Sequence, residues 1–68
     1  MIATDQELHA MLDRIRHFQV QIAQLRIAET DSANFRLSAS GFLAEIDRMQ
    51  LEVREYLSLH PTHSVVAG

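Results

Sequence analysis

Apolar residues recur through the first part of the chain at alternating spacings of three and four positions. This heptad pattern is typical of a helix with one apolar stripe. The stripe consists of Leu8, Met11, Ile15, Phe18, Ile22 and Leu25. Thr4 and Glu7 form a capping-box pair ahead of it, in which we expect the Thr4 hydroxyl to accept from the Glu7 amide and Glu7 to bond back to the Thr4 amide. The pattern predicts a helix over residues 5–28.

A second stripe with the same spacing follows. Its members are Phe35, Ala39, Phe42, Ile46, Met49, Val53, Tyr56 and His60. We predict a second helix over residues 32–59, ended by Pro61, whose ring cannot continue a helix. Gly41 costs about 1 kcal/mol relative to alanine inside a helix, although the small residues around it could instead let a neighbouring helix approach closely. Residues 1–60 would form the domain and residues 61–68 a disordered tail.

Short polar residues separate the two stripes. Residues 29–33 read Glu-Thr-Asp-Ser-Ala, and such side chains favour turns and helix caps. We expect Thr30 or Asp31 to be the N-cap of the second helix. A short turn between two helices favours an antiparallel hairpin. One continuous helix is the alternative, because no glycine marks the end of the first helix.

Many apolar residues lie outside the two stripes. Val20 and Ile27 lie on the far side of the first helix. Leu43 and Leu57 widen the second stripe, and three leucines lie off it: Leu37, Leu51 and Leu59. Leu12 widens the first stripe, and Gln19 and Arg26 flank it where polar residues often set partner choice. This amount of apolar surface predicts a second buried face. We therefore expect an all-α hairpin that pairs into a dimeric four-helix bundle.

Composition supports association and excludes several other classes. The chain has 68 residues and no cysteine, so a small core would have no disulfide to stabilise it. The net charge of −3, with six arginines and no lysine, argues against nucleic-acid binding by this chain alone. No apolar run approaches the roughly 20 residues of a membrane span, and the acidic N-terminus does not resemble a secretion signal. A cytoplasmic location is the expectation.

The chain also resembles a known module. The opening residues 1–8 (MIATDQEL), the heptad helix, the polar break, residues 42–49 (FLAEIDRM) and residues 52–57 (EVREYL) are similar to the N-terminal helical hairpin of bacterial antitoxin-like, XRE-type helix-turn-helix regulators. That hairpin precedes a DNA-binding domain, for which these 68 residues leave no room. The resemblance therefore implies a small interaction or oligomerisation element, such as a regulatory or antitoxin-like protein partner, and carries over no base-reading residues.

Histidines provide the alternative hypothesis. His9, Asp13 and His17 are spaced four residues apart on the first helix, and His60 and His63 flank Pro61. A bundle that brought His9, His17, His60 and His63 together could bind a metal such as zinc. Helical rise separates His9 from His17 by about 12 Å, so they cannot share one ion unaided. No serine lies on a nucleophile turn and no glycine-rich loop is present, so we expect neither an enzyme nor a cofactor.

Overall fold

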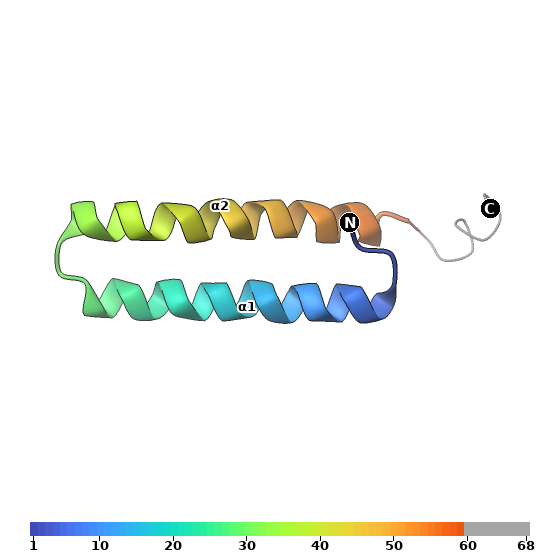
Figure 1. Cartoon of the computed structure of the whole chain (residues 1–68), viewed down its shortest axis with the longest axis horizontal. Coiled ribbons are helices and arrows are strands. Elements are labelled where there is room, and N and C mark those ends of the chain that lie inside the picture. Colours follow the sequence, from blue (N-terminus) through green and yellow to red (C-terminus); the bar gives the residue numbers. More distant parts are fainter. Residues whose placement is uncertain (60–68) are drawn as a thin grey trace.

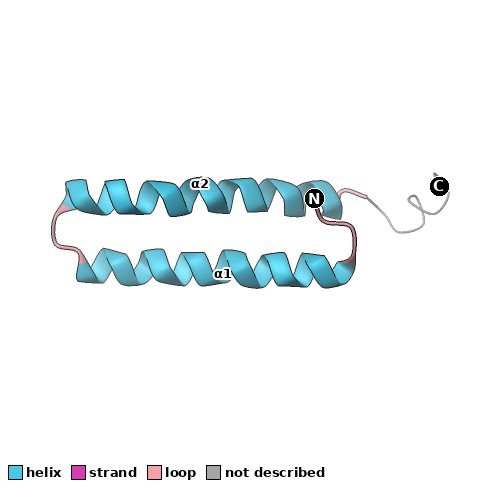
Figure 2. Ribbon diagram, viewed as in Figure 1, coloured by secondary structure: helices cyan, strands magenta, loops and turns pink. Residues whose placement is uncertain are grey.

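Two antiparallel helices make up the described part of the protein. The computed structural model describes residues 1–59, in which α1 spans Asp5–Ala28 and α2 spans Ser32–Leu57. The helices lie side by side along their whole length and are joined by a short turn (Figures 1 and 2). No strand occurs within residues 1–59. The predicted all-α hairpin is confirmed, and the continuous-helix alternative is wrong.

The start of α1 is capped much as the sequence predicts. The Glu7 amide donates to the Thr4 hydroxyl at 3.1 Å, which satisfies one of the free amides of the first turn. The return bond differs from the prediction, because the Glu7 carboxylate accepts from the Ala3 amide at 3.2 Å and not from Thr4. This bond reaches one residue further back and fixes the chain that leads into α1.

The turn is organised by two acidic side chains. Asp31 is the N-cap of α2, and one of its carboxylate oxygens accepts from the amides of Ala33 at 2.8 Å and Asn34 at 3.3 Å. Glu29 takes an extended conformation at the end of α1 and accepts from the Asp31 amide at 3.0 Å. Of the two predicted caps, Asp31 is therefore the residue used, and the turn needs no glycine.

The second helix ends earlier than predicted, at Leu57 and not at Leu59. Ser58 is the C-cap, and its hydroxyl donates to the Glu55 carbonyl at 2.6 Å. The Leu59 amide bonds to the Tyr56 carbonyl at 3.1 Å, a tighter i to i−3 bond that closes the last turn. The helix therefore ends two residues before Leu59, the last helical residue predicted from the position of Pro61. The predicted tail over residues 61–68 lies outside the described residues, as do His60 and His63.

A single layer of apolar side chains lies between the helices. The buried cluster consists of Ile2, Leu8, Ile15, Ile46, Met49 and Val53, with Met11, Phe18, Ile22 and Tyr56 packed against it. Ala39 is also buried, and the rings of Phe18 and Phe42 pack at a tilt with centroids 5.6 Å apart. Each helix thus buries only the face that meets the other helix. Within residues 1–59, neither helix combines the length and apolar character needed to cross a membrane.

Candidate interaction surface

Helical geometry gives the hairpin two broad faces, each spanning both helices. At about 100° per residue, Leu12 and Gln19 lie about 70° to one side of the buried stripe of α1. Leu43, Gln50 and Leu57 lie about 70° from the buried stripe of α2 in the same rotational sense. Because the helices are antiparallel, the same direction of rotation from each buried stripe leads to the same side of the hairpin. All five residues therefore lie on that side. We call this set of five residues the open face.

The opposite face is crossed by the chain that precedes α1. We call residues 1–4 the strap, and the face that it crosses the strap face. The strap turns back from the start of α1 toward the end of α2 (Figure 1). Ile2 is only 6% exposed, although it lies outside both helices. It therefore closes the core at this end of the hairpin.

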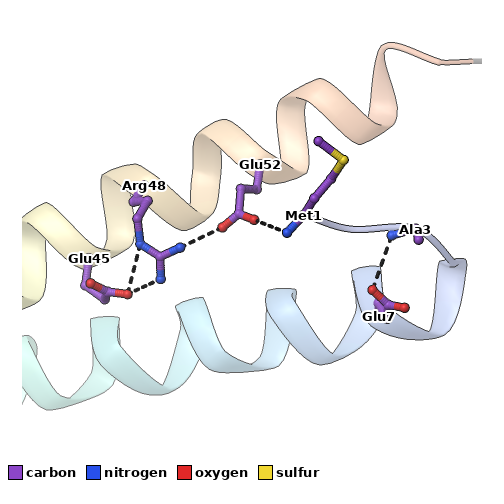
Figure 3. A network of polar contacts seen from close by, with 6 residues as sticks. All are labelled: Met1, Ala3, Glu7, Glu45, Arg48 and Glu52. Atoms are coloured by element: carbon purple, nitrogen blue, oxygen red, sulfur yellow. Dashed lines mark hydrogen bonds and ion pairs between the residues drawn. The ribbon is translucent and has the colours of Figure 1, made fainter.

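Ion pairs hold the strap to α2. The α-ammonium group of Met1 lies 3.0 Å from the Glu52 carboxylate, which also accepts from Arg48 at 2.9 Å (Figure 3). Arg48 also pairs with Glu45, so the predicted Arg48–Glu52 pair is part of a longer chain of charges. The hydrogen bond from the Met1 ammonium lowers the pKa of Glu52, and the charges of that ammonium and of Arg48 act in the same direction. The Glu45 carboxylate raises the pKa of Arg48 in turn. The strap face therefore carries a chain of ion pairs along α2.

The open face has a different character. Leu12, Leu43 and Leu57 are 41%, 49% and 64% exposed, and Gln19 and Gln50 are exposed between them. The five side chains carry no charge. Arg26 and Arg36 continue the same two rows near the turn, and Asp5 continues the row of α1 at the opposite end. The middle of the open face is consequently uncharged, and the charged side chains Arg16, Asp47 and Arg54 lie beside it toward the outer edges of the hairpin.

Two further apolar ridges lie on the outer edges of the hairpin, opposite the buried stripes. Val20 and Ile27 form the ridge on α1 and are 46% and 86% exposed. Leu37 and Leu51 form the ridge on α2 with Ala44 between them, and these leucines are 77% and 54% exposed. Each ridge is one helix wide.

The residues predicted for the core and interface occupy the inner faces of both helices. The buried ones are Leu8, Ile15, Ile46, Met49 and Val53. The half-buried ones are Met11, Phe18, Ile22, Leu25, Phe35, Phe42 and Tyr56. These side chains are used mainly within one hairpin, which leaves the open face and the outer ridges for contact with a partner. The predicted core set does not include Ile2. The apolar residues ahead of the Thr4 cap indicate only that this segment could pack back onto Leu8, and Ile2 is buried in the same cluster as Leu8.

The histidines of the metal hypothesis are not assembled into a site in the described part of the chain. His9 and His17 are both exposed on α1, and the ring of His17 lies 6.3 Å from that of Phe18. No group of three or more potential metal-ligating side chains comes together within residues 1–59. His60 and His63 lie outside this range, so the four-histidine arrangement stays a prediction.

Comparisons of the chain with protein-family models, with curated proteins and with solved structures found no match.

Proposed function

We propose that this chain is a protein–protein association module that pairs with a second copy of itself to complete a four-helix bundle. One observation carries the proposal: seven large aliphatic side chains of α1 and α2 are between 41% and 86% exposed. They are Leu12, Val20, Ile27, Leu37, Leu43, Leu51 and Leu57. Single exposed leucines are common on protein surfaces, but seven on two helices are a large fraction of the apolar residues that the hairpin has.

The size of the core supports the same proposal. A domain of about 60 residues buries only about 60% of the surface that its unfolded chain exposes. In this hairpin each helix has one neighbour, and Met49 is the largest side chain that is fully buried. Complete burial of an aliphatic side chain stabilises by roughly 1.5–3 kcal/mol. Covering part of the exposed apolar surface would therefore add substantially to a marginal stability.

The resemblance to the N-terminal hairpins of antitoxin-like regulators favours the same class of function. That resemblance implies an interaction or oligomerisation element and supplies no base-reading residues. The mixed, net acidic charge of the present chain agrees with a protein partner better than with a polyanionic one. On this basis a small regulatory role exerted through association is the biological function we propose.

The mass of the chain in solution tests the proposal. Light scattering on the full chain at about 100 µM, a concentration at which even a micromolar complex is populated, should give twice the single-chain mass of 7.7 kDa. A fully helical protein with the single-chain mass would overturn the proposal. As a control, Ile46→Asp places a charge in the intramolecular core, so this variant should lose helicity and the doubled mass together.

A further inference from the structure

We infer that the second copy binds on the open face, so that Leu12, Gln19, Leu43, Gln50 and Leu57 of one chain meet the same residues of the other. This inference rests on the proposed self-association and adds to it the surface that is used. Three kinds of surface are available in the described part of the chain: the strap face, the outer ridges and the open face.

Surface area decides against the outer ridges. A helix of 24 residues is about 36 Å long and about 10 Å wide, so one ridge offers about 360 Å². A face that spans both helices offers about 700 Å². Stable protein–protein interfaces bury about 800 Å² on each partner. A two-helix face comes close to this requirement, whereas one ridge provides less than half of it.

Charge and the position of the strap decide against the strap face. A partner on that face would have to cover the Glu45–Arg48–Glu52 ion pairs and the Met1 ammonium, and removing such charges from water is costly. The strap also lies on this face with Ile2 buried beneath it. Displacing the strap would expose Ile2 again, so docking there would remove one apolar contact to make others.

The open face has the composition of an interface centre. Charged residues are depleted at the centres of protein interfaces and are found at their rims. Here three leucines and two glutamines occupy the middle, and the charged side chains surround them at the ends and outer edges: Asp5, Arg16, Arg26, Arg36, Asp47 and Arg54. A twofold pair uses the same patch on both chains. The glutamine amides can each donate and accept, so they can satisfy one another when they are covered.

Paired substitutions on α2 test the choice of face. Leu43 and Leu37 are 49% and 77% exposed, so a glutamate at either position should leave the core of the hairpin intact. We expect Leu43→Glu to reduce the mass to that of one chain while helicity is retained at high concentration, and Leu37→Glu to keep the doubled mass. If Leu37→Glu dissociates the pair, or if Leu43→Glu leaves it intact, the open face is not the interface, although self-association stands. A wild-type chain with the single-chain mass overturns both the proposed self-association and the proposed use of the open face by a second copy.

Thiol labelling gives an independent readout that does not depend on a disruptive charge. The chain has no cysteine, so single-cysteine variants can be labelled cleanly with a maleimide. Gln50→Cys lies on the open face, and its matched control Ala44→Cys lies on the outer ridge of the same helix. When nine-tenths of the chains are paired, labelling of Gln50→Cys should be about tenfold slower than labelling of Ala44→Cys, because only the unpaired fraction reacts. Equal rates for the two variants would overturn the inference.

Discussion

The hydroxyl of Tyr56 donates to Oδ1 of Asp5 at 2.6 Å, and this bond joins the last turn of α2 to the first turn of α1 across 51 residues of sequence. At the other end of the hairpin the two helices are connected covalently through the Asp31 turn. At this end the contacts are non-covalent, and they comprise the Tyr56–Asp5 bond, the buried Ile2 and the ion pair between Met1 and Glu52. These contacts determine whether the open end of the hairpin stays closed.

The Tyr56–Asp5 bond predicts a specific alkaline sensitivity. The hydrogen bond to Asp5 raises the pKa of Tyr56 above its ordinary value of 10.0, with burial and the Asp5 charge contributing in the same direction. A raised pKa in the folded state means that the contribution to stability is complete below about pH 10 and is lost as the pH rises further through the folded-state value. We expect the melting temperature of the wild type to fall more steeply above about pH 10 than that of Tyr56→Phe.

The Tyr56→Phe variant serves as its own control near neutral pH. Because the ring is retained, the packing against the core should be preserved, and only a small decrease in melting temperature is expected at pH 7. Identical pH profiles for the two proteins above pH 10, measured by thermal unfolding, would show that the Tyr56–Asp5 bond does not contribute to stability.

Although Ile2 lies outside both helices, we expect its truncation to reduce the stability of the hairpin strongly. The Ile2→Ala substitution removes a side chain that is only 6% exposed, and such truncations in cores cost about 2–5 kcal/mol. Its matched control is Ile27→Ala, because Ile27 is 86% exposed and surface substitutions usually change stability by less than about 0.5 kcal/mol. Denaturant unfolding of the two variants measures the difference. Equal free energies of unfolding would mean that the strap is not part of the folded core.

We expect the substitution Gly41→Ala to stabilise the hairpin. A Cβ atom added at Gly41 would meet nothing within 4 Å, so an alanine fits without any change in packing. Alanine is favoured over glycine inside a helix by about 1 kcal/mol, which corresponds to a rise of about 4–8 °C in melting temperature for a domain of this size. The neighbouring Ala39 is the contrast, because it is 1% exposed and a leucine there should destabilise by about 1–3 kcal/mol through overpacking. A lower melting temperature for Gly41→Ala would indicate that this position needs a small residue for contact with another chain.

The parts of the fold that depend on local chemistry could be predicted from the sequence, whereas those that depend on three-dimensional context could not. The Thr4 cap and the start of α2 at Ser32 follow from side chains that bond to amides two or three residues away. The heptad spacing likewise predicts the inner faces of both helices. The end of α2 at Leu57 depends on a competition between the Ser58 hydroxyl and the backbone that a proline-based rule does not describe.

The candidate interaction surface illustrates the same limit. The sequence indicates that Leu43 widens the second stripe and that Leu37 lies off it, but it does not show which helix lies beside either residue. Only the arrangement of the helices places Leu43 on a face that spans both of them and Leu37 on a narrow outer edge. Similarly, apolar residues ahead of the Thr4 cap indicate packing against Leu8 of α1, whereas the turn of the strap toward α2, which completes the burial of Ile2, depends on where α2 lies.

A dilution series that follows mass by sedimentation and helicity by circular dichroism tests the central claim most directly. If burial of the exposed apolar surface between copies stabilises the fold, the mass should fall from two chains to one upon dilution. The melting temperature of the helical signal should fall with it, because association stabilises only the folded state. A chain that has the mass of a single copy and an unchanged melting temperature at every concentration would contradict the claim.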